Sequence, residues 1–173
     1  KNKFYNLIDT LIEDEAWQEH TQESLHIRDP QITVFLDRQK HIATEYAGVI
    51  DPLDLDEYKT GGGFEALEKC INHLKSSEII ATIKESGLRG RGGAGFHTGI
   101  KWQMAHDNRD KIKYIICNGD EGDPGAFMDR MILESYPFRV LEGIIIAAFA
   151  VGAHEGFLYI RAEYPLAVER VQH

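Results

Sequence analysis

The sequence has few cysteines and no excess of positive charge. Its only cysteines, Cys70 and Cys117, are far apart in the chain and form no C-x-x-C pair. This spacing predicts neither a zinc site nor a disulfide framework, so we expect two core thiols in a reducing compartment. The formal net charge of −9 argues against a nucleic-acid-binding surface, because such surfaces are normally basic.

Long apolar runs are also absent. The most apolar stretch, from Ile144 to Ala153, is much shorter than the roughly 20 residues that a membrane-spanning helix needs. The chain begins with Lys1-Asn-Lys-Phe4, which does not read as a signal peptide. We therefore expect a cytoplasmic chain without a membrane span.

The sequence divides into three segments by composition and periodicity. Residues 1–29 combine a stripe of apolar side chains with many acids, which predicts a solvated acidic helical arm. Residues 30–75 read as a mostly helical lead-in. Residues 76–173 alternate helices with short apolar strands, a pattern typical of a Rossmann-like α/β sandwich with mainly parallel strands.

Local signals predict where the elements begin and end. We expect Asp51 to cap a helix that Gly61 to Gly63 ends, and Ser76 or Ser77 to cap another that Gly87 ends. The remaining expected elements are an apolar helical stripe over 64–74, one or two helical turns over 99–106, a buried strand over 113–117, helices over 128–135 and 137–152, a strand over 156–160 and a helix from residue 165.

The run from Gly87 to Trp102 is the most unusual stretch of the chain. Four of the six residues from Gly90 to Gly95 are glycine, and Arg89, Arg91 and Lys101 are interleaved with the run. Glycine lets the backbone approach a flat or phosphorylated ligand closely, at a cost in conformational entropy. The nearby cations favour an anionic ligand.

A second polar stretch, Asn118 to Gly125, directly follows the expected buried strand. Open α/β sheets bind their ligands beyond the carboxyl ends of such strands. A calcium-loop template fits only in part, because Asp123 stands where that template requires glycine and Asp129 is shorter than the expected glutamate. The stretch is therefore a candidate second wall for a ligand site.

Gly90 to Gly95 also matches the G-x-G-x-x-G fingerprint, with Asp120 near the place of a ribose-binding acid. That motif must follow a strand, whereas Ile79 to Ser86 has a helical pattern. A phosphate-binding loop of the Walker A type is excluded, because no Gly-Lys-Ser/Thr follows the glycines.

Both motifs together resemble the flavin-binding subunit of NADH dehydrogenases. That family includes the NADH-oxidising subunit of respiratory complex I and the diaphorase subunits of NAD(P)-linked hydrogenases and formate dehydrogenases. The resemblance is carried by Gly87 to Trp102 and Asn118 to Arg130, with support from Glu142-Gly143 and from Tyr159 to Tyr164. It extends from about Ile42 to the end of the chain.

Members of this family carry FMN, accept a hydride from NADH and pass single electrons to an iron–sulfur cluster. The resemblance implies that the glycine-run residues line FMN, that a lysine pairs with its phosphate or polar edge, and that the second motif hydrogen-bonds its ribityl chain and ring. The residues so implied are Gly90, Arg91, Gly92, Lys101, Asn118, Asp120 and Glu121. Phe96 would stack on the incoming dinucleotide, and Asp123 would bind NADH.

The departures from the pattern bear on the branch of the family. Complex I members usually have glutamate at the position of Asp123, and together with Gly119 and Ala126 this aspartate is more similar to the hydrogenase or formate dehydrogenase branch. The electron donor could therefore be NADH or NADPH.

Several motifs of the family are not in this sequence, namely its later glycine–glutamate motif, its asparagine pair and its cluster-binding cysteines. With the last helix lacking a cap, this predicts a C-terminally truncated flavin domain over residues 76–173, with the 4Fe–4S ligands beyond His173. We therefore expect this chain alone to be inactive and to retain FMN weakly or not at all through purification. The implied partners are the iron–sulfur subunits of a multi-subunit oxidoreductase, which could lie peripherally at the inner face of a membrane.

Two other hypotheses remain open from the residues alone. A Rossmann-type NAD-binding module without flavin would require a strand immediately before Gly87. A pure assembly surface would act through the acidic residues 1–29.

Overall fold

A computed structural model of the chain describes residues 34, 38–46 and 49–173. The chain divides into two units, Lys1–Ile42 and Ala43–His173, and the second contains the sheet with the helices packed on it. The prediction of an acidic arm over residues 1–29 lies outside the described residues.

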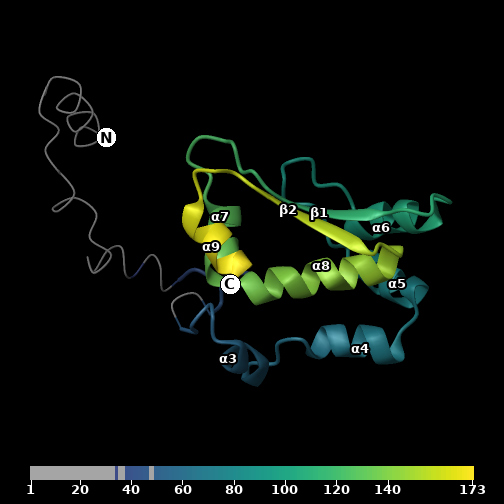
Figure 1. The fold of residues 1–173 in the computed structure, drawn as a ribbon, viewed down its shortest axis with the longest axis horizontal. Coiled ribbons are helices and arrows are strands. Elements are labelled where there is room, and N and C mark those ends of the chain that lie inside the picture. The colour runs from purple at the N-terminus through teal and green to yellow at the C-terminus, as the bar shows by residue number, and fades with distance from the viewer. Residues whose placement is uncertain (1–33, 35–37, 47–48) are drawn as a thin grey trace, which may run out of the picture. The chain divides into compact units, whose positions relative to one another are not determined.

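Within the described residues, helices and strands form a mixed fold with a small parallel sheet (Figure 1). In chain order the elements are α3 (Leu55–Thr60), α4 (Glu65–His73), α5 (Ser76–Glu85), α6 (Thr98–Asp107), β1 (Tyr114–Gly119), α7 (Met128–Ser135), α8 (Pro137–Val151), β2 (Glu155–Ile160) and α9 (Pro165–Gln172). None of the helices in these residues is long and apolar enough to cross a membrane.

Helix α3 begins later than the sequence indicated. The carboxylate of Asp54, not Asp51, accepts a hydrogen bond from the Glu57 N–H (2.8 Å) and so caps the helix. Asp51 belongs to the preceding turn, where its carboxylate accepts from the Leu53 N–H (2.9 Å). Gly61 ends the helix, as expected.

Helix α5 also begins differently. Lys75 occupies the cap position, and the Glu78 carboxylate accepts a hydrogen bond from its N–H (2.7 Å). The Ser76 hydroxyl instead donates to the carbonyl oxygen of Phe149 (3.0 Å), which ties α5 to α8. The helix ends where the sequence predicts, with Gly87 in the left-handed region at φ +68°.

Strands β1 and β2 are parallel, in a register that runs from Tyr114 opposite Glu155 to Gly119 opposite Ile160. Helices α7 and α8 form the connection between them. Helix α8 contacts both strands, and α4 contacts α8, so that α8 lies between the sheet and α4 (Figure 1). The carboxyl ends of both strands therefore lie at the same edge of the sheet.

The prediction of a buried strand over 113–117 is wrong for one of the two faces of β1, which is exposed. Ile115 and Cys117 are partly buried, but Ile116 is 67% exposed and Tyr159 on β2 is 60% exposed. A Cβ at Gly156 would lie 3.4 Å from the Ile144 side chain of α8, which marks the covered face. In the described residues the helices cover only that face.

Two clusters of buried side chains form the core. One joins α4, α5 and α8 through Cys70, Ile79, Ile80 and Ala150. The other joins α7 and α9 through Leu133, Tyr164 and Ala167, with Leu158 and Ile160 of β2 packed against it. The prediction of a core thiol is confirmed for Cys70, whereas Cys117 on β1 is only partly buried. Burial raises the pKa of both thiols.

Helices α5 and α6 approach one another closely at Gly99. A Cβ at this position would lie 2.6 Å from the backbone nitrogen of Lys84 and 2.7 Å from its Cα. Only glycine fits this contact. The contact fixes the two helices that flank the glycine run.

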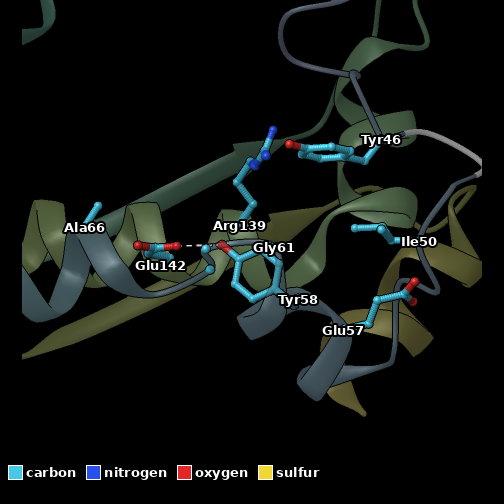
Figure 2. Close-up of a pocket in the computed structure, with 10 residues that line it drawn as sticks. Tyr46, Ile50, Glu57, Tyr58, Gly61, Ala66, Arg139 and Glu142 are labelled. Carbon is cyan, nitrogen blue, oxygen red and sulfur yellow. Dashed lines mark hydrogen bonds between the residues drawn. The ribbon is translucent and has the colours of Figure 1, made fainter.

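Glu142 of α8 anchors the segment that joins α3 to α4. Its carboxylate accepts hydrogen bonds from the Tyr58 hydroxyl (2.5 Å) and from the N–H groups of Phe64 and Leu67 (both 3.1 Å). Figure 2 shows the Tyr58 hydroxyl directed at this carboxylate beside a cavity of about 230 Å³. Burial raises the pKa of Tyr58, and its hydrogen bond to Glu142 raises it further.

Candidate functional site

The glycine run forms a closed loop between α5 and α6. Arg89 and His97 pair as an antiparallel bridge, in which the Gly90 N–H donates to the Phe96 carbonyl (2.8 Å) and the Thr98 N–H donates to the Leu88 carbonyl (2.9 Å). The Arg89 guanidinium also donates to the carbonyl of Gly95 (3.0 Å). These bonds hold both ends of the loop together.

The tip of this loop presents bare backbone. Gly93 and Gly95 have φ values of +100° and +61°, which disfavour residues with a side chain. A Cβ at either position, or at Gly92, would meet no atom within 4 Å. Backbone shape therefore requires glycine at positions 93 and 95, and the space beside Gly92, Gly93 and Gly95 is open to a ligand.

The second polar stretch forms a loop at the carboxyl end of β1. The Asn118 side-chain oxygen accepts a hydrogen bond from the Asp120 N–H (3.0 Å), and the Asp123 carbonyl accepts from the Ala126 N–H (3.1 Å). Within the described residues, the carboxylates of Asp120 and Asp123 have no hydrogen-bond partner. Both are exposed and can accept bonds from a ligand.

Glu121 differs from these neighbours because its side chain points to the protein. Its Oε1 accepts from the Asp129 N–H (2.8 Å), and its Oε2 accepts from the Arg130 N–H (3.1 Å) and the Tyr164 hydroxyl (3.2 Å). Its main-chain oxygen accepts from Arg161 (2.9 Å). Burial raises the pKa of the Glu121 carboxyl, but the hydrogen bonds lower it by more, so the pKa lies below its usual range.

The glycine loop and the carboxylate loop face one cleft of about 850 Å³. The residues predicted for the site that line it are Arg91, Gly92, Asn118, Asp120, Glu121 and Asp123. The first turn of α7 closes it with Phe127, Met128 and Asp129. Gly90, Phe96 and Lys101 are outside this lining: Gly90 and Phe96 form the base of the loop, and Lys101 is exposed on α6.

Charge is distributed unevenly around the cleft. Arg91 and the glycine backbone form one wall, while Asp120, Asp123 and Asp129 contribute acids to the other. Burial raises the pKa of Asp129, and the neighbouring Glu121 charge raises it further. An extended ligand with an anionic group at one end and hydroxyls along its length matches this arrangement.

The element before the glycine run excludes a Rossmann fingerprint. Helix α5 ends at Glu85, two residues before Gly87, where that motif requires a strand. The hypothesis of a Rossmann-type NAD module without flavin is therefore not supported. In the described part of the chain, no group of three or more His, Cys, Asp or Glu side chains is arranged to hold a metal ion.

Comparison with known proteins identifies the family of the chain. The sequence pattern of the Nuo51 FMN-binding domain family matches residues 83–173, more than half of the chain. The chain belongs to this family. The match includes the glycine loop and the carboxylate loop, so the cleft between them lies wholly within the Nuo51 FMN-binding domain.

Individual relatives are components of oxidoreductases. The chain is 50% identical over 135 residues to the NADP-reducing hydrogenase subunit HndC of Solidesulfovibrio fructosivorans, covering 78% of this chain and 27% of that protein. It is 52% identical over 111 residues to an NADH-quinone oxidoreductase subunit of Aquifex aeolicus, covering 64% of this chain and 26% of that protein.

A solved structure shares the fold of this chain. The crystal structure of an NAD+-reducing NiFe-hydrogenase in the air-oxidized state aligns with a TM-score of 0.61 at 32% identity, covering 78% of this chain and 22% of that chain. The chain spans about a quarter of the length of the curated relatives it matches.

Sequence reasoning did not assign roles to Asp129, Arg161 and Tyr164. Asp129 lines the cleft, and the other two hold Glu121 from the segment that follows β2. The order of the elements in the sequence could have indicated the roles of Arg161 and Tyr164. Parallel strands end at one edge, so residues just after β2 should meet residues just after β1.

Proposed function

We propose that this chain forms part of the flavin-binding domain of an NAD(P)H-oxidising oxidoreductase subunit. Its fold would be the first part of a Rossmann-like α/β sandwich that holds FMN in the cleft between the two loops. The observation that carries this proposal is the convergence of Arg91 and Gly92 with Asn118, Asp120 and Asp123 on one cleft. The family match over residues 83–173 supports it.

The residues present fit FMN. A flat ring and a phosphate both need close approach to backbone, and the open space beside Gly92, Gly93 and Gly95 offers it. A ribityl chain offers several hydroxyls, which suit carboxylates that are free of protein partners. Asp120 and Asp123 have such carboxylates within the described residues.

Each wall of the cleft then has its own role. Gly90, Arg91 and Gly92 would line the flavin, with the Arg91 guanidinium beside its phosphate. Lys101 would meet the phosphate or the polar edge from α6. Asn118 and Asp120 would hold the ribityl chain and the ring edge. These residues bind and orient the cofactor.

The dinucleotide would enter over the same opening. Phe96 is 50% exposed at the base of the glycine loop, where its ring can stack on a base or nicotinamide. Asp123 lines the cleft and can accept bonds from ribose hydroxyls. When bound, FMN supplies the redox chemistry, since a flavin accepts a hydride and returns electrons one at a time.

The wider assembly is part of the proposal. Relatives of the chain are named as subunits of NADH-quinone oxidoreductases and NAD(P)-reducing hydrogenases. On this basis the electrons would pass to iron–sulfur partner subunits, through a 4Fe–4S cluster that this sequence does not ligate. A cytoplasmic location, peripheral to a membrane, is the matching expectation.

The role of Arg91 can be tested by comparing two flavins. We expect the chain to bind FMN more tightly than riboflavin, which lacks the phosphate, in a fluorescence-quenching titration. Arg91→Met should weaken FMN binding by about ten- to a hundredfold and leave riboflavin binding almost unchanged, because a charge-assisted contact to phosphate contributes about 1.5–3 kcal/mol.

Arg109→Met is the matched control, because Arg109 is exposed and does not line the cleft. That variant should bind both flavins as the unmodified chain does. Equal weakening by the two substitutions, or no binding of either flavin at millimolar concentration, would contradict the proposal.

A further inference from the structure

Glu121 lines the cleft, yet its carboxylate accepts its hydrogen bonds from other groups of the protein. Its carboxylate accepts from the N–H groups of Asp129 and Arg130, which belong to the first turn of α7. These N–H groups have no partner within a helix and are a preferred position for a negative charge. Glu121 therefore acts as an N-terminal cap of α7 from a residue well before the helix.

The backbone of Glu121 is also held in an uncommon conformation. Its φ is +32°, and among the described non-glycine residues only Phe64 shares a positive φ. Such a conformation costs free energy and persists only where surrounding contacts maintain it. Here the Arg161 guanidinium binds the main-chain oxygen of the same residue at 2.9 Å.

A third contact comes from the segment after β2. The Tyr164 hydroxyl donates to the Glu121 carboxylate (3.2 Å), and two guanidinium groups lie near the buried ring of Tyr164. Arg130 and Arg161 are 5.5 Å and 5.3 Å from its centroid. Glu121 thus links the end of β1, the start of α7 and the turn after β2.

We infer that Glu121 is a positioning residue that holds the Asn118–Asp123 loop against α7 and Tyr164, and not a direct ligand of the flavin. This inference rests on the proposed function of the cleft. Because the Glu121 carboxylate fills the anion-binding position at the start of α7, the phosphate of the flavin is directed to the glycine loop. Asn118 and Asp120 then face the cleft in a fixed geometry.

Two substitutions separate a positioning role from a direct contact. Glu121→Gln removes the charge and one acceptor, while Tyr164→Phe removes a hydroxyl that does not line the cleft. Glu85→Gln is the matched control, because it makes the same chemical change on an exposed residue of α5 that does not line the cleft. Amide hydrogen exchange and FMN titration are measured on all three and on the Glu121→Gln/Tyr164→Phe double variant.

We expect Glu121→Gln to speed exchange of the Asp129 and Arg130 amides and to weaken FMN binding about tenfold. Tyr164→Phe should shift both readouts in the same direction by less, and the double variant should match Glu121→Gln, since both groups act through one contact. Glu85→Gln should change neither readout.

Unchanged exchange at Asp129 and Arg130 in Glu121→Gln overturns the inference. So does Tyr164→Phe binding FMN as tightly as the unmodified chain while Glu121→Gln binds weakly, because that result makes Glu121 a direct ligand. If the unmodified chain binds no flavin, the proposed function fails, and the exchange data alone still decide whether Glu121 holds the loop. If Glu121→Gln does not fold, Tyr164→Phe decides the question.

Discussion

At the scale of single residues, the buried carboxylate of Glu142 makes a contact that should contribute to stability. It is the only charged side chain that is buried among the described residues, at 8% exposure. Three donors satisfy its carboxylate, two of them backbone N–H groups at the start of α4. A buried carboxylate is tolerated only when it is hydrogen-bonded in this way.

Glu142→Gln should lower the free energy of unfolding by about 1–3 kcal/mol, because an amide leaves a buried donor without an acceptor. Tyr58→Phe removes one donor and leaves both backbone bonds, so it should cost about 1 kcal/mol. Urea unfolding followed by circular dichroism measures both. The control, Glu68→Gln on the exposed side of α4, should change little, and a Glu142→Gln loss no larger than the control would refute the anchor.

Individual residues of the site were predictable only in part. The glycine run and the carboxylate loop are visible in the sequence because their residue types are unusual together. The role of Glu121 was not visible, because its partners Arg161 and Tyr164 are 40 and 43 residues away. A carboxylate that caps a helix and one that binds a ligand look the same in a sequence.

At the scale of elements, the close contact between α5 and α6 fixes the frame of the glycine loop. Gly99 permits it, since any Cβ there would overlap the backbone of Lys84. Gly143 in α8 provides the opposite case, because a Cβ at that position would meet nothing within 4 Å. Substitution of Gly99 by alanine therefore tests helix packing, and substitution of Gly143 by alanine tests the backbone entropy of the unfolded chain.

Gly99→Ala should lower the free energy of unfolding by about 1–3 kcal/mol, because α5 and α6 must separate to admit the methyl group. Gly143→Ala should raise it by about 0.5–1 kcal/mol, since alanine favours a helix interior. Chemical denaturation gives both values. Destabilisation of similar size by both substitutions would show that the overlap at Lys84 is relieved without cost.

Element types were predicted well and element starts less well. Apolar periodicity located α4 and α5, and proline at the first position marked the starts of α8 and α9. Gly87 and Gly152 follow helix ends as expected. The starts of α3 and α5 were misplaced, because several Asp and Ser residues could cap them and only tertiary contacts choose. The strand β1 was expected to be buried on both faces, whereas in the described residues helices cover one face only.

At the scale of the whole molecule, the topology explains why two distant motifs make one site. Parallel β1 and β2 deliver their following loops to the same edge, where Arg161 meets the carboxylate loop. The closed glycine loop faces the same cleft from between α5 and α6. The fold thus places Arg91 and the glycine backbone on one side of the cleft and three aspartates on the other.

The central claim is that FMN binds in this cleft. Isotope-edited NMR of the labelled chain during an FMN titration tests it most directly. The account predicts that the amides of Arg91, Gly92, Gly93, Asn118 and Asp120 shift in proportion to occupancy, while those around Tyr58 and Glu142 do not. Shifts centred on the cavity beside Tyr58 and Glu142, or no specific shifts at millimolar FMN, would contradict it.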